Sequence, residues 1–421
     1  MKKLIALTLA TLMMLTLVAC GGTTATETTS SETETQTEEG FVPALDSETE
    51  ATLYVVGGWG NFEALDQVAL DFKEYYPNVE VVYTKLDDTR ADMANRFATG
   101  EEIDMFICDW WDVANVSNDD IVANAEDLNQ AGIDFSNINA DLLVTGENDG
   151  QQVMLPVYLQ IMGYMVNLDI MDSTGVEVPI DFDSLESVAG KLTEAGYEKP
   201  IYVDSGHYKR NFVPYYLEQI ENGDDDVTAL DETIAKMNVL YDDGYINDEG
   251  DTLEDTYNAL ILRFFEGDLP IQFIPTGSFC GTAKREDQSE AFTESPFEYE
   301  FVPMSFDSDG TSYVSQTGSL YIGSYKDSKN LDITNEFLRF MFTDSEMDVL
   351  RSIKKMPTSN QNNGLDDFPY LSWDKLTYVN QNGASAETEE IANSVLKLYE
   401  YGTDNSAAYE QLDYLLENGI N

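Results

Sequence analysis

Apolar and polar residues recur with two different periods after residue 50. Uninterrupted apolar runs predict short β-strands over residues 52–56, 79–83 and 103–108. Between these runs, apolar residues return every three or four positions, which predicts helices over residues 65–76 and 90–99. Strands that alternate with helices predict an α/β fold with mainly parallel, doubly wound sheets.

The same two periods continue towards the C-terminus. Further strands are predicted over residues 200–203, 271–274, 301–304 and 319–323, and further helices over residues 183–196, 212–240, 331–342 and 387–401. Asp183 and Glu186 have the spacing of a capping-box variant at the start of the first of these helices. About 370 residues follow residue 50, which is more than one core usually holds, so we expect two lobes.

The first twenty residues have the pattern of an export signal. Lys2 and Lys3 precede an uncharged, mostly apolar stretch over residues 4–18, which is shorter than the roughly 20 residues that a membrane-spanning helix needs. The run Leu17-Val18-Ala19-Cys20 resembles the bacterial lipobox, which implies a diacylated Cys20 at the mature N-terminus. An ordinary cleaved signal and an N-terminal anchor helix remain the alternatives. We expect residues 1–20 to be a lipoprotein signal peptide.

Residues 21–50 are dominated by Thr, Ser and Glu. Such a segment buries too little apolar surface to offset its ordering entropy, so we expect a disordered tether between the anchor and the folded part.

The formal net charge of −57 excludes some kinds of partner. It argues against nucleic acid and against docking on anionic lipid, since both attract Lys and Arg. A solvated acidic surface that keeps an exported protein soluble is favoured over calcium buffering. Cys108 and Cys280 could form one disulfide, but a buried thiol is favoured for Cys108. No Gly-rich phosphate loop or His/Cys metal cluster occurs, so we expect no cofactor and no metal.

Several short motifs follow one another in a recognisable order. They are a strand ending in Trp (51–60), an "A-x-G-x-x-x-D" pattern (97–104), a "D-G-K-x-Y-G-L-P" pattern (149–157), an "L-x-Y-N-K" pattern (163–167), an "F-x-x-G-x-A-A-M" pattern (265–271) and the segments 328–330, 336–338 and 356–358. In this order the chain resembles the extracellular solute-binding proteins of ABC importers, in the maltose-binding-like group. It departs from the family at Val166 and Leu168, where Tyr and Lys are usual.

The resemblance implies a two-lobe, periplasmic-binding-protein-like α/β fold with hinge strands and a ligand cleft between the lobes. One lobe would hold residues 50–157 and 317–352, and the other residues 158–316 and 358–421. It also implies a monomeric, lipid-anchored protein on the extracellular face of the cytoplasmic membrane. Such a protein captures a small ligand, here a carbohydrate, and delivers it to the permease subunits of the importer. The lipid anchor would be its only attachment to the membrane.

A sugar site needs flat aromatic rings for stacking and polar groups that donate and accept hydrogen bonds. Residues of both kinds follow predicted strand ends, where such sheets bind ligands. The candidates from the pattern are Trp59, Asn61, Asp109, Trp110, His207 and Tyr208. Gln160, Phe279 and Trp373 are added by the resemblance.

Two other functions stay open. A secreted glycosidase needs two suitably spaced carboxylates, but the 79 acidic residues make coincidental pairs uninformative. No G-x-S-x-G motif supports a serine hydrolase, so we expect no enzyme activity. A sensor domain that uses the same fold is not separable from a transport protein by sequence.

Overall fold

The computed structural model describes residues 40–419, apart from residues 59–62, 87–88, 110–121, 254–255, 280–281, 315–317, 362–363, 365–366, 369, 372 and 379–385. Residues 1–40 are a unit separate from residues 41–421. Cys20, the predicted signal peptide and residues 21–39 of the predicted tether lie outside the described residues.

The first of two five-stranded sheets has the strand order β2-β1-β3-β13-β6. Its strands are β1 (Ala51–Gly57), β2 (Val79–Lys85), β3 (Met105–Asp109), β6 (Leu155–Leu159) and β13 (Gly318–Ser324). Helices α1 (Glu63–Phe72), α14 (Leu331–Met341) and α15 (Asp344–Lys354) share a core with one face, and α2 (Thr89–Thr99) shares a core with the other. Because both faces are covered, successive residues of β6, of β13 and of the run 103–108 are all buried, which explains these uninterrupted runs. The edge strand β2 differs, since its buried or half-buried residues alternate with exposed ones.

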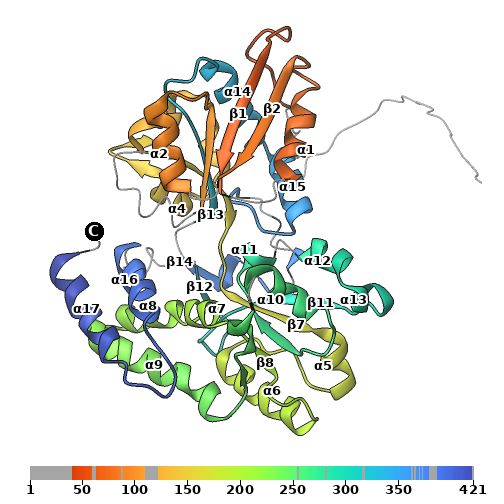
Figure 1. Cartoon of the computed structure of the whole chain (residues 1–421), viewed down its shortest axis with the longest axis vertical. Helices are drawn as coiled ribbons and strands as arrows, with labels where there is room; N and C mark the ends of the chain where they lie inside the picture. The colour runs from red at the N-terminus through yellow and green to blue at the C-terminus, as the bar shows by residue number, and fades with distance from the viewer. Residues whose placement is uncertain are drawn as a thin grey trace, which may run out of the picture. The chain divides into compact units, whose positions relative to one another are not determined.

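The second sheet has the strand order β11-β7-β10-β8-β9. Figure 1 labels its strands β7, β8 and β11. Its strands are β7 (Gly163–Asn167), β8 (Ile201–Tyr202), β9 (Ile246–Asn247), β10 (Ile271–Phe273) and β11 (Tyr299–Pro303). One face shares a core with α5 (Leu168–Thr174), α6 (Phe182–Glu194), α7 (Ser205–Arg210), α8 (Val213–Asn222), α9 (Asp226–Asp242), α16 (Ala386–Leu396) and α17 (Ser406–Asn418). The other shares a core with α10 (Thr256–Phe264), α11 (Thr276–Phe279) and α13 (Glu290–Glu294).

The remaining described elements are short. They are several 3₁₀ turns, α4 (Ala140–Leu143), α12 (Thr282–Gln288) and two small sheets, one of β4 (Glu147–Asn148) with β5 (Gln151–Gln152) and one of β12 (Ser312–Val314) with β14 (Leu376–Tyr378).

One strand in each large sheet runs against the other four. In the first sheet this strand is β13, and in the second it is β7. The chain leaves the first sheet at the end of β6 and enters the second at the start of β7, with only residues 160–162 between them. A strand that enters a sheet at the edge where its neighbours end must run in the opposite direction. The predicted mainly parallel α/β fold is therefore confirmed, with this one reversal in each sheet.

Several helix ends differ from the sequence prediction; the helix predicted over residues 387–401, for example, ends at Leu396. The helix predicted over residues 65–76 ends at Phe72, after which the backbone N–H groups of Tyr75 and Tyr76 both donate to the Phe72 carbonyl in tight turns. The capping box of α6 is formed by Asp181 and Ser184, so the prediction of Asp183 and Glu186 is wrong. The Asp181 side chain accepts from Ser184 N at 2.7 Å, two residues earlier than the pattern indicated.

Residues 41–46, which the sequence analysis places in a disordered tether, make specific contacts. The Phe41 ring packs edge-on against Phe340 with centroids 5.0 Å apart, and the Arg339 guanidinium lies over it at 4.3 Å. Ala44 N donates to Glu336 Oε1 at 2.8 Å. The prediction of disorder is therefore wrong for this segment, because one aromatic side chain finds a partly covered core and a cation.

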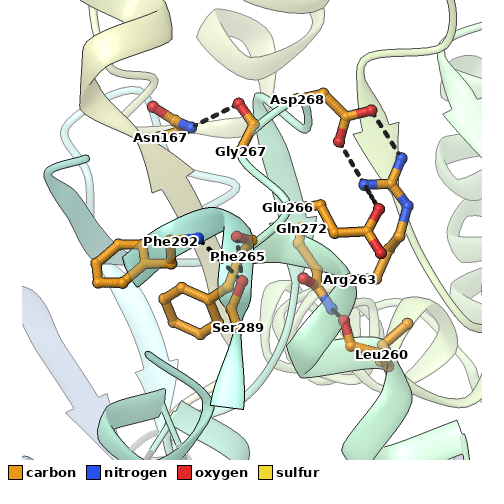
Figure 2. Close-up of polar contacts among 10 residues, drawn as sticks. All are labelled: Asn167, Leu260, Arg263, Phe265, Glu266, Gly267, Asp268, Gln272, Ser289 and Phe292. Atoms are coloured by element: carbon orange, nitrogen blue, oxygen red, sulfur yellow. Dashed lines mark hydrogen bonds and ion pairs between the residues drawn. The ribbon is translucent and has the colours of Figure 1, made fainter. Parts of the chain in front are cut away.

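The turn between α10 and β10 is held by side chains (Figure 2). Arg263 at the end of α10 pairs with Asp268 and with Glu266, the latter at 3.1 Å. Gly267 has a φ of 86°, a conformation that disfavours any residue with a Cβ, and Asn167 Nδ2 donates weakly to its carbonyl at 3.5 Å. Ser289 Oγ donates to Phe265 O at 2.8 Å and caps α13 by accepting from Phe292 N at 3.1 Å. These bonds fix α13 against the turn.

Candidate ligand-binding site

The chain segment between the two sheets is tied to the end of β10 by Thr276. Ile161 N donates to Thr276 Oγ1 at 2.9 Å, and this hydroxyl donates to Leu159 O at 3.0 Å. Thr276 N in turn donates to Ile161 O at 2.9 Å. All of these groups are buried, so the turn after β10 and the connection between the sheets form one rigid unit.

Gln160 lies within this connection and is 7 % exposed. An added Cβ at Gly277 would stand 2.8 Å from Gln160 Oε1 and 3.2 Å from Ser319 Oγ, so only glycine allows this close approach. Among the residues that the structure describes, none forms a hydrogen bond with the Gln160 side-chain amide. An amide that makes no hydrogen bond with any described residue has both a donor and an acceptor left for a ligand.

His207 approaches the same turn from α7. Asp204 caps this helix by accepting from His207 N at 3.0 Å, and its other oxygen contacts His207 Nδ1. Burial by itself raises the pKa of Asp204, but hydrogen bonds from His207 and its charge outweigh burial and lower it below its usual range. His207 Nε2 lies 3.3 Å from Ser278 Oγ. The imidazole is thus oriented on one side by a carboxylate and on the other by a hydroxyl.

The structure therefore brings together Gln160, His207 and the turn Gly277–Ser278. Sequence reasoning named the first two and missed Ser278 and Asp204. A signal for Asp204 was present, because an Asp at the end of a predicted strand and three residues before another polar residue is typical of an N-cap.

Tyr208 and Phe279 face other surroundings. Tyr208 is 1 % exposed, and its hydroxyl donates to Met237 O at 2.5 Å inside the core of the second sheet. Phe279 is buried among Phe301, Tyr299 and Phe368, with ring centroids 5.7, 6.1 and 6.3 Å away, and lines a cavity of about 600 Å³. Neither ring is in the group formed by Gln160 and His207.

The other candidates are described partly or not at all. Trp59, Asn61 and Trp110 lie outside the described residues. Asp109 ends β3, where it pairs with Leu320 of β13, and Trp373 begins a 3₁₀ turn at residues 373–375. The backbones of Asp109 and Trp373 thus lie at or near element ends, and their side chains are outside the described part of the chain.

Within the described ranges, no cluster of three or more His, Cys, Asp or Glu side chains is arranged to hold a metal ion. No helix in that part of the chain is both long and apolar enough to span a membrane. Cys108 is buried in β3, and Cys280 lies outside the described residues.

Comparison with solved structures gives the class of the fold. The GacH receptor of Streptomyces glaucescens, known unliganded and with acarbose, is 17 % identical, with a TM-score of 0.66 over 88 % of this chain and 98 % of that one. The cyclic α-maltosyl-1,6-maltose binding protein of Arthrobacter globiformis is 18 % identical, with a TM-score of 0.63 over 88 % and 100 %. RafE of Streptococcus pneumoniae, in complex with raffinose, is 13 % identical, with a TM-score of 0.62 over 86 % and 98 %.

The fold is thus the two-lobe fold of periplasmic binding proteins, as the sequence predicted. Residues 58–348 match the family described as bacterial extracellular solute-binding protein. Because this match covers well over half of the chain, the protein belongs to that family, which is extracellular and binds solutes. None of the curated protein sequences compared with the chain is significantly similar to it.

Proposed function

We propose that this protein captures a carbohydrate between its two lobes and delivers it to the permease of an ABC importer. The observation that carries the proposal is the Gln160 amide, which is nearly buried in the connection between the two sheets and lacks a partner among the described residues. His207 and Ser278 lie against the same turn, so amide, imidazole and hydroxyl groups are available for the hydroxyls of a sugar.

Three similar structures support a sugar as the solute. Their names give acarbose, cyclic α-maltosyl-1,6-maltose and raffinose as ligands. The ring faces for stacking would come from Trp59, Trp110 and Trp373, with Asn61 and Asp109 beside them. Tyr208 and Phe279 are not part of this proposed site, since the first has its hydroxyl bonded in the core and the second faces another cavity.

The topology supports hinge closure about the ligand. The segment 160–162 joins the sheets, and residues 357–359 pair with β6 beside it. We place one lobe at residues 50–157 and 317–352 and the other at residues 158–316 and 358–421. The lipobox supports a lipid anchor at Cys20 that holds a monomer at the outer face of the cytoplasmic membrane.

The test is a thermal-shift screen of the protein against mono- and oligosaccharides, followed by calorimetry on each hit. A sugar that binds only the folded state should raise the melting temperature. Gln160→Ala should weaken binding of that sugar by about tenfold, the loss of one or two hydrogen bonds, while Gln130→Ala on an exposed turn leaves affinity unchanged.

Incubation of each hit with the protein, followed by product analysis, separates a binding protein from a glycosidase. Recovery of the sugar unchanged supports capture and release. Turnover of the sugar, or the absence of any sugar hit, would contradict the proposal.

A further inference from the structure

The cavity of about 600 Å³ that Phe279 lines is built by elements of both sheets. One wall comes from β11 and from α12 and α13, which accompany the second sheet. The opposite wall comes from Arg351, Ser352 and Lys355, at the end of α15, which packs on the first sheet. Its volume lies within the range of about 300–1,000 Å³ typical of sites for small molecules.

The strand order places the α15 side of this cavity along the edge of β6 that does not pair with β13. One edge of β6 pairs with β13, beyond which lie β3 and β1. The other edge pairs with the segment after α15, since Leu159 N donates to Pro357 O and Ser359 N to Val157 O, both at 2.9 Å. Arg351 and Lys355 come just before this segment. The part of the lining that α15 provides therefore lies beside the edge of β6 that faces away from β13, β3 and β1.

Six aromatic rings line the cavity: Phe279, Phe292, Phe297, Tyr299, Phe301 and Phe368. They hold one another mostly edge to face; Phe292 and Phe297, for example, meet at 82° with centroids 5.1 Å apart. The Ser289 bonds that fix α13 also fix Phe292, as Figure 2 shows. The walls are thus preorganised, which lowers the cost of ordering them around a ligand.

Carboxylates outnumber cations around these rings. The lining includes Glu286, Glu298, Glu300 and Asp367 against only Arg351 and Lys355. Both cations have acidic neighbours: Arg351 pairs with Asp367 and with Asp348, the latter at 3.2 Å, and Lys355 Nζ lies 3.8 Å from Glu286. With a net charge of −57 on the whole chain, the cavity repels anions and concentrates cations.

We propose that this cavity is a second binding site, which takes a small organic cation with an apolar or aromatic body, such as an alkyl- or arylammonium compound. Aromatic faces attract ammonium groups, and the excess carboxylates neutralise them. Since the walls belong to both sheets, hinge motion changes the cavity's shape. The cation and the sugar should therefore alter each other's affinity by the same factor.

The test is calorimetric titration of the full chain with benzyltrimethylammonium chloride, and with phenylacetate and benzyl alcohol as anionic and neutral compounds of similar shape. The Kd for benzyltrimethylammonium should be millimolar or lower. The Kd values for phenylacetate and benzyl alcohol should be higher by about threefold or more. Phe297→Leu, which keeps an apolar side chain but removes the ring, and Glu298→Gln, which removes an exposed charge, should each weaken the cation by about threefold or more. Glu294→Gln, an exposed residue of α13 that does not line the cavity, is the matched control and should have no effect.

A sugar hit from the screen then tests the separation of the two sites. Two sites are supported if the Kd for the cation changes by a limited factor that levels off as the sugar saturates. Gln160→Ala should then leave cation binding unchanged. Full competition by the sugar would overturn the proposal, as would equal binding of all three compounds, no binding of the cation, or an unchanged affinity in both cavity variants. Because the cation titration needs no sugar, a failed carbohydrate screen would leave this test intact.

Discussion

Glu218 on α8 offers a sharp test of how burial shapes this protein's stability. Its side chain is 9 % exposed, and its Oε2 is buried without a hydrogen-bond partner among the described residues. The pKa of Glu218 rises from 4.5 to about 8, mainly because of burial and in smaller part because of the adjacent Asp307 carboxyl. Protonated Glu218 can donate a hydrogen bond to Asp307, whereas ionised Glu218 meets a like charge.

The sign of the pH dependence follows from this raised pKa. Between pH 4.5 and about 8 the folded state holds a proton that the unfolded state has released, so stability falls as pH rises through this window. A rise of about 3.5 pH units corresponds to a loss of at most about 5 kcal/mol at the alkaline end. Glu218→Gln removes this loss, because the amide is uncharged at every pH and can still donate to Asp307.

The assay is urea denaturation of wild type and variant at about pH 5 and about pH 8.5, followed by circular dichroism. From about pH 5 to about pH 8.5, the free energy of unfolding of Glu218→Gln should rise by several kcal/mol relative to that of wild type. The control Glu232→Gln, on the exposed side of α9, should show no such rise. If the difference between Glu218→Gln and wild type is the same at both pH values, the carboxyl is not held neutral and the reasoning is refuted.

Three further outcomes are expected. Gly277→Ala should lower sugar affinity by about tenfold, because its Cβ would stand 2.8 Å from Gln160 Oε1 and displace that amide; unchanged affinity by calorimetry would remove Gln160 from the site. Tyr208→Phe should destabilise the fold by about 1 kcal/mol by leaving Met237 O without its donor, with no change in sugar affinity; a change would return Tyr208 to the site. Trp59→Ala should weaken sugar binding by about tenfold with an unchanged melting temperature, and equal calorimetric affinities would exclude Trp59.

Most strands and helices were predictable because local periodicity and burial coincide in this fold. Strands covered on both faces appear as apolar runs, and the amphipathic α14 lies within one residue of its predicted bounds. The errors came from contacts that sequence patterns do not encode. Phe41 is ordered by Phe340 and Arg339, which lie about 300 positions away along the chain, and no local pattern shows that contact.

The candidate site likewise combines residues that local sequence predicted with contacts that only the structure shows. The sequence predicted both His207 and Tyr208 as site residues, because they are adjacent and follow a predicted strand end. Only the structure separates them: successive residues of α7 point in different directions, so His207 meets Ser278 and Tyr208 enters the core. Phe279, named as a stacking partner by resemblance, faces an aromatic cavity that no motif indicated.

The sequence by itself determined the α/β class, the two lobes and the solute-binding family, because these depend on periodicity, chain length and the order of motifs. The tertiary structure decided which polar groups meet. Gln160, His207 and Ser278 are separated by tens of residues, and hydrogen bonds through Thr276 and Asp204 bring them to one turn. It also decided where aromatic rings gather beside β6, since packing depends on strand order, which residue spacing along the chain does not specify.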